Sequence, residues 1–255
     1  YGAALEKSGK KYFLDKTPRY FFIVPDLYRL FPEARFIFLK RNPLSILSSI
    51  LSTYVKIKWA AIGFYRPDLL DAPSKILDGI SLLGDKAIDL KYEDFVENPE
   101  KCCKMLCEYI GVPFVDGMVD YGDTTAPKGY MNDPVGIHKY SRPSKASLDK
   151  WKQLAENRQH SYFATRYLEN LGEGTLTKLG YSYNELYRIV NTSQQHKGLY
   201  SWELAMKTKD DWTIKDRFIS HRYYLVADKG KLLGTLTVIY RELIKNLRKL
   251  KKQII

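Results

Sequence analysis

One short stretch of the chain brings a guanidinium, an amide and two hydroxyls together. Arg41 follows an apolar run, Asn42-Pro43 comes next, and Ser45 and Ser49 stand one helical turn apart on one face. A guanidinium fork matches phosphate oxygens, and the first turn of a helix favours negative charge. The residue types and their spacing therefore predict a holder for a phosphate group.

A strand followed by a helix has to position these groups. Residues 34–39 are an apolar run that predicts a buried strand, which ends at Lys40. Asparagine is a good helix cap and proline suits the first helical position, so a helix is predicted from Pro43 to about Trp59. Ligands of open α/β sheets bind where strands end and helices begin. We therefore expect the phosphate site at a strand end.

Other segments predict further elements of the same sheet. Residues 86–92 predict a second strand, and helix-like patterns occupy residues 17–31, 74–83, 99–110 and 150–171. Alternating strands and helices indicate an α/β domain.

Two segments lack such periodicity. Residues 62–75 contain Gly63, Pro67 and Pro73 and predict a loop or short turns. Residues 114–147 are rich in glycine, proline, aspartate and serine, and long irregular segments in compact domains are usually functional or mobile.

The stretch around Arg41 resembles the 3′-phosphate-binding motif of the sulfotransferases, which use 3′-phosphoadenosine 5′-phosphosulfate (PAPS). Four more landmarks occur in the family's order. They are the Lys-Thr-Pro signature before the motif, the Tyr-Glu-Asp turn of a later strand, a basic loop with a Trp-containing helix, and the closing LGYSYNE, at residues 16–18, 92–94, 138–154 and 179–185. The resemblance covers roughly residues 10–185.

The resemblance implies a three-layer α/β/α fold with a mainly parallel central sheet, similar to the P-loop NTPases. This domain is expected over residues 1–184, and residues 185–255 predict a helical, basic C-terminal extension. Its last helix-like stretch, 231–253, is apolar on one face and carries six Lys or Arg residues near its end. Such a helix packs on its own domain or makes peripheral contact with a membrane surface, and both alternatives stay open.

The family's second phosphate-cradling element should precede the Lys-Thr-Pro signature. This loop holds the 5′-phosphosulfate, and no such loop occurs before Lys16. The catalytic domain is therefore expected to be N-terminally incomplete in this chain.

The resemblance implies roles for individual residues near the phosphates. Lys16 is expected to stabilise charge on the transferring group or the leaving oxygen. Arg41 and Ser49 are the expected 3′-phosphate ligands, with Ser45 as a weaker candidate.

Further residues are expected around the nucleotide. Tyr92 is expected to lie beside it, through its ring or its hydroxyl. Arg142, Lys145 and Ser147 belong to the basic loop that closes over the nucleotide in this family. The acceptor also needs a base, for which His138 is the most plausible of the four histidines.

Composition excludes several other classes of function. The net charge of +12 fits an anionic ligand, and no zinc finger, helix-turn-helix or RNA-recognition signature indicates a nucleic-acid partner. The three cysteines all fall in residues 102–107, which predicts reduced thiols and no metal site. No apolar run of about eighteen residues occurs, so no membrane span is predicted. A cytoplasmic protein is favoured, and a Golgi-lumenal one follows if an upstream anchor exists.

The leading hypothesis is a PAPS-dependent sulfotransferase. It would move a sulfuryl group to a hydroxyl or amine of an acceptor, such as a glycan, a lipid or a small molecule, and release 3′-phosphoadenosine 5′-phosphate (PAP). One alternative is a non-catalytic module of the same fold that binds a nucleotide or an anionic glycan. Another is a P-loop kinase, although the chain has no G-x-x-x-x-G-K-[ST] motif. The acceptor and the oligomeric state are not predicted.

Overall fold

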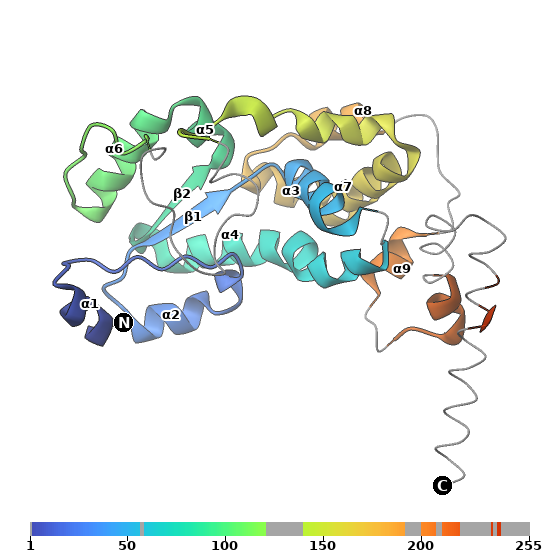
Figure 1. The fold of residues 1–255 in the computed structure, drawn as a ribbon, viewed down its shortest axis with the longest axis horizontal. Coiled ribbons are helices and arrows are strands. Elements are labelled where there is room, and N and C mark those ends of the chain that lie inside the picture. The colour runs from blue at the N-terminus through green and yellow to red at the C-terminus, as the bar shows by residue number, and fades with distance from the viewer. Residues whose placement is uncertain are drawn as a thin grey trace, which may run out of the picture.

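The computed structural model describes residues 2–56, 59–120, 140–191, 200–207, 211–219, 236 and 239–240. Helices dominate these residues, and two parallel strands lie at their centre (Figure 1). This composition agrees with the predicted α/β class. None of the described helices is both long and apolar enough to cross a bilayer.

The two strands are β1 (Phe36–Lys40) and β2 (Ala87–Lys91), and the second lies where it was predicted. They pair in parallel, with Phe36 opposite Ala87 and Lys40 opposite Lys91. The Lys40 ammonium also forms an ion pair with Asp89 of the neighbouring strand. Because parallel strands end at the same edge, the residues that follow Lys40 and Lys91 leave the sheet side by side.

Helix α4 (Ala72–Leu83) covers one face of the sheet, beneath the strands in Figure 1. Its Gly79 makes room for Phe38 of β1, since a Cβ atom at this glycine would lie 3.1 Å from the Phe38 ring. Helix α5 (Tyr92–Glu97) packs against β2. Helix α4 thus packs against one face of the sheet and contacts both strands.

The prediction of a fully buried strand at residues 34–39 is wrong. Ile37 and Leu39 of β1 are 39% and 55% exposed, whereas Leu90, the register partner of Leu39, is buried. On the face of the sheet opposite to α4, the described residues therefore bury Leu90 of β2 but leave β1 exposed. The predicted three-layer arrangement is not confirmed. An apolar run alone cannot distinguish burial on one face from burial on two.

Helix α3 (Pro43–Ile50) begins at the predicted residue but ends early. A π-helical turn, η2 (Leu51–Val55), follows it, and Lys56 has a φ of +48° that breaks the helical path. The predicted continuation to Trp59 is therefore wrong. Residues 62–75, predicted as a loop or short turns, contain the end of the 3₁₀ segment η3 (Trp59–Tyr65), the π turn η4 (Pro67–Asp71) and the start of α4.

The other N-terminal elements follow the sequence pattern in part: the helix predicted over 99–110 is present, whereas the one predicted over 17–31 forms only from residue 24 and residues 2–8 form a helix that was not predicted. Pro25 stands at the start of α2, and Gly111 ends α6 in the left-handed conformation, as a glycine after a helix commonly does. These elements are α1 (Gly2–Ser8), η1 (Tyr20–Phe22), α2 (Val24–Leu30), η5 (Gly84–Lys86) and α6 (Pro99–Ile110).

The C-terminal half is built around one long helix, α7 (Arg158–Leu179). The Asn157 side chain accepts hydrogen bonds from the first-turn amides, Gly172 interrupts the helix with a φ of +74°, and Gly180 ends it. The first helical segment therefore ends at Leu171, as predicted, and a second segment continues from Gly172 to Leu179. Around it lie η6 (Lys145–Ser147), η7 (Lys150–Glu156), α8 (Tyr183–Val190) and α9 (Trp202–Met206).

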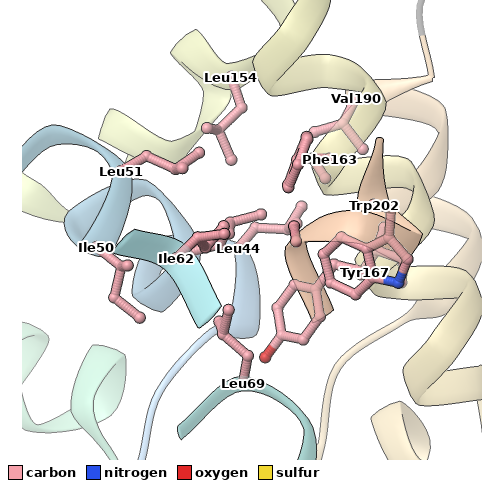
Figure 2. Packing of buried hydrophobic residues seen from close by; sticks show 14 of the residues in the cluster. Leu44, Ile50, Leu51, Ile62, Leu69, Leu154, Phe163, Tyr167, Val190 and Trp202 are labelled. Carbon is pink, nitrogen blue, oxygen red and sulfur yellow. The ribbon is translucent and has the colours of Figure 1, made fainter. Parts of the chain in front are cut away.

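One hydrophobic cluster among the described residues joins α3, α7, α8 and α9. Figure 2 shows the rings of Tyr167 and Trp202 side by side, and their centroids are 6.0 Å apart. Phe163 lies 5.6 Å from Trp202 and 4.9 Å from Trp59. Side chains from both sides of residue 184 share this core. The domain boundary at 184 stays a prediction, and most of the helix predicted over 231–253 lies outside the described residues.

Stability is expected to fall in mild acid because of His160, which lies on α7 beside the Trp59 ring. Burial lowers its pKa from the ordinary value of 6.5. The unfolded chain then binds the proton more readily, so stability present above pH 6.5 is lost as the pH falls toward the folded-state pKa. Urea unfolding at about pH 7.5 and about pH 5 should show a larger drop for the wild type than for His160→Gln. Equal drops would contradict this assignment.

Candidate functional site

The candidate site lies where both strands end. Arg41 follows β1, Tyr92 follows β2, and the Arg41 guanidinium carbon lies 4.4 Å from the centre of the Tyr92 ring. A guanidinium over an aromatic face is held by cation–π attraction and keeps its in-plane N–H groups for other partners. The parallel register therefore brings together two predicted site residues that are far apart in the sequence.

The Arg41 Nε–H is the most informative group in this site. It is buried, and it has no hydrogen-bond partner among the described residues. Leaving a buried charged donor unsatisfied is costly, so such a group in a folded protein needs an explanation. An anion bound between the strand ends would supply the missing acceptor.

The start of α3 supports the same interpretation. The Asn42 side chain accepts a hydrogen bond of 2.9 Å from the Leu44 amide, and Pro43 occupies the first turn. Asn42 and Ser45 are both buried, at 7% and 5% exposure. The positive end of the helix dipole thus lies immediately beside Arg41.

Ser147 joins this group from a distant part of the chain. Its hydroxyl lies 3.3 Å from the Tyr92 hydroxyl, and either group can donate the hydrogen bond. Ser147 ends η6, whose start is capped by the Ser144 hydroxyl. The segment predicted to close over a nucleotide therefore does reach Tyr92 through one of its residues.

Other predicted residues are not joined to this group by any interaction that the structure gives. Arg142 is exposed and forms ion pairs with Glu100 (3.2 Å) and Asp120 (2.7 Å). Lys145 is exposed on η6, and Ser49 is exposed on α3, one turn from the buried Ser45. Lys16 is exposed in the segment before η1. His138 lies outside the described residues. The roles of these residues remain predictions.

Sequence reasoning missed a second layer behind Arg41. The Glu93 carboxylate accepts one hydrogen bond from the Asn42 amide (2.9 Å) and another from the Tyr181 hydroxyl (2.8 Å). The sequence placed Glu93 only within the Tyr-Glu-Asp turn at residues 92–94 and gave it no role in binding. One sequence signal pointed to this contact: Glu93 lies in the Tyr-Glu-Asp turn and Tyr181 in LGYSYNE, and both segments are among the family's landmarks.

Lys91 is the third residue of this second layer, after Glu93 and Tyr181. Its ammonium donates a 2.6 Å hydrogen bond to the Gly180 carbonyl and lies 5.0 Å from the centre of the Tyr181 ring. Gly180 has a φ of +88°, a conformation that residues with a side chain rarely adopt, and a Cβ atom there would lie 2.5 Å from Lys91 Cε and displace the end of that side chain, so glycine is favoured here. Burial, followed by the contact with Glu93, raises the pKa of Tyr181, which therefore stays protonated and donates.

The arrangement suits the binding of an anion at a fixed position. It offers a guanidinium with an open donor, a helix N-terminus, and an aromatic ring from the adjacent strand end. Within the described ranges, no group of three or more His, Cys, Asp or Glu side chains could hold a metal ion.

Comparison with known proteins gives one family. Residues 2–116 match the sulfotransferase family, a range that includes both strands, Arg41 and Tyr92. Mouse carbohydrate sulfotransferase 1 is 32% identical over 133 residues, which are 50% of this chain and 29% of that protein. Zebrafish protein-tyrosine sulfotransferase 1 is 25% identical over 122 residues, 46% of this chain and 34% of that protein.

A shorter match has a higher identity. The nodulation protein NoeE of Sinorhizobium fredii is 44% identical over 54 residues, 21% of this chain and 13% of that protein. The chain thus spans only 13% to 34% of the length of these three relatives. No solved structure gives a significant match.

Proposed function

The chain belongs to the sulfotransferase family by the match over residues 2–116, and from that premise we propose that it carries the nucleotide-binding half of a PAPS-dependent sulfotransferase. The family membership confirms the resemblance drawn from the motif at Arg41. The donor, the acceptor and turnover by this chain are parts of the proposal.

The observation that carries the proposal is the buried, unpartnered Nε–H of Arg41 among the described residues. In the proposed complex this guanidinium binds the 3′-phosphate of PAPS, together with the N-terminus of α3. The Tyr92 ring, already held against Arg41, then lies beside the nucleoside. The product PAP keeps the same 3′-phosphate, so it should bind to the same groups.

The chemistry follows from the donor. The sulfur–oxygen bond to the leaving phosphate breaks, a new bond forms to the acceptor oxygen or nitrogen, and the acceptor's proton passes to a base. Negative charge grows on the leaving phosphate, and a cation beside it lowers the barrier. Lys16 is the proposed source of that charge, and the base is not assigned. The mouse and zebrafish relatives are named for carbohydrate and protein tyrosine, which makes these the first acceptors to test.

Calorimetric titration with PAP and with adenosine 5′-phosphate tests the proposed nucleotide site. We expect PAP to bind at least about tenfold more tightly, because only PAP offers a 3′-phosphate to Arg41. Equal affinities would contradict the site. Incubation with radiolabelled PAPS and a carbohydrate or tyrosine peptide then tests turnover. PAP binding without transfer would favour the non-catalytic module, and tighter binding of ATP with Mg²⁺ would favour the kinase.

A further inference from the structure

We propose that Glu93 is a positioning residue for Arg41 and that Tyr181 tethers Glu93 to the turn between α7 and α8. The inference rests on the proposed function, since it concerns the same phosphate site. It assigns to two side chains outside the anion-binding group the task of holding that group in place.

The first step is the contact at the backbone of Asn42. Its amide belongs to the peptide bond that joins Arg41 to Asn42, and it donates to Glu93 Oε1 at 2.9 Å. A hydrogen bond at this peptide fixes the backbone from which the Arg41 side chain leaves. Asn42 itself is buried, so water cannot readily replace the carboxylate.

The second step is the contact that orients the carboxylate. Glu93 Oε2 accepts a 2.8 Å hydrogen bond from the Tyr181 hydroxyl, so both oxygens are engaged by donors from different parts of the chain. Tyr181 is held in turn by Lys91, which lies over its ring and binds the Gly180 carbonyl. The end of α7 is thereby connected to the start of α3 through one carboxylate.

The negative charge of Glu93 is unexpected close to a proposed phosphate site. A carboxylate close to a phosphate site repels the ligand, so a site optimised for charge alone would not contain one. Glu93 lies against the peptide bond between Arg41 and Asn42 although its charge opposes anion binding. Its two hydrogen bonds give it a geometric task that offsets this repulsion.

Glu93→Gln is the variant that separates geometry from charge. Glutamine keeps the size but has one acceptor oxygen where Glu93 uses two. The two charge-assisted hydrogen bonds therefore become one neutral bond from the Asn42 amide and one contact in which the Tyr181 hydroxyl has to accept instead of donate. Removing a negative charge should by itself strengthen PAP binding. We instead expect about tenfold weaker binding by calorimetry, because Arg41 loses its fixed position. Tyr181→Phe should weaken binding by a smaller factor, since Glu93 then keeps the bond to Asn42.

Residues close in sequence to Glu93 and Tyr181 provide matched control variants. Asp94→Asn removes a neighbouring exposed carboxylate and should leave PAP affinity unchanged or slightly higher. Tyr183→Phe removes a hydroxyl two residues from Tyr181, on a ring that stacks on Tyr187, and should leave it unchanged. In an Arg41→Lys background, Glu93→Gln should cost clearly less than in the wild type, because it acts through the guanidinium.

The outcomes separate this inference from the proposed function. A wild-type chain that binds no PAP overturns the proposed function and this inference with it. A wild-type chain that binds PAP, together with unchanged or tighter binding by Glu93→Gln, overturns the inference alone. A Glu93→Gln variant that melts at lower temperature but keeps the wild-type affinity shows a purely structural residue, which also overturns it.

Discussion

Arg41→Ala is expected to weaken PAP binding at least about a hundredfold, the largest effect on binding of any single change in this chain. Loss of one partner from a buried, charge-assisted contact typically costs about 2–5 kcal/mol, and each 1.4 kcal/mol corresponds to about a factor of ten. The substitution also removes the group whose buried Nε–H lacks a partner among the described residues. Calorimetric titration with PAP measures the effect directly.

Arg35 provides a closely matched control for this experiment. It precedes β1 at the end opposite to Arg41, and its guanidinium lies 5.5 Å from the centre of the Tyr109 ring. Arg35→Ala therefore removes the same charge and the same kind of aromatic contact away from the strand ends, and PAP affinity should stay within about a factor of two. Similar losses for both variants would indicate general attraction by a basic protein, and the 3′-phosphate assignment to Arg41 would fail.

Trp202→Ala is expected to lower the free energy of unfolding by about 3–5 kcal/mol. Trp202 is 3% exposed and packs its ring against Phe163 and Tyr167 of α7. Truncation leaves a large cavity that the surrounding rings cannot fill completely. Since a typical domain is stable by only about 5–15 kcal/mol, the variant loses a large part of its stability. Urea unfolding followed by circular dichroism measures the change.

The aromatic residue Phe64 offers the comparison for Trp202. Its side chain is 61% exposed, so Phe64→Ala should change the free energy of unfolding by no more than about 0.5 kcal/mol. A loss below about 1 kcal/mol for Trp202→Ala would show that α9 contributes little to the core. The expected larger loss would instead show that residues beyond 184 stabilise the preceding helices.

Local signals predicted the elements on which the site depends. Asn42-Pro43 marked the start of α3, residues 86–92 contained β2, and Gly111 ended α6 at the expected place. These features depend on capping, proline geometry and short apolar runs, which act over a few residues. The same local pattern predicted Arg41 and Tyr92 as residues at strand ends.

Contacts between distant segments could not be predicted in this way. The exposure of Leu39 depends on which helices cover the sheet, and the apolar pattern does not distinguish α3 from the π-helical turn that follows Ile50. The bond between Glu93 and Tyr181 joins two segments whose spacing in sequence carries no periodic signal. Such pairs emerge only when the strand order and the path of α7 are known.

The contact between Glu93 and Tyr181 also bears on how members of this family are recognised and compared. The segment that identifies the family ends at residue 116, whereas Tyr181 lies far beyond it. An alignment restricted to that segment would match Arg41, Tyr92 and Glu93 and omit Tyr181, the hydrogen-bond partner of Glu93. Two proteins with identical motifs could then differ in affinity through residues that neither motif contains.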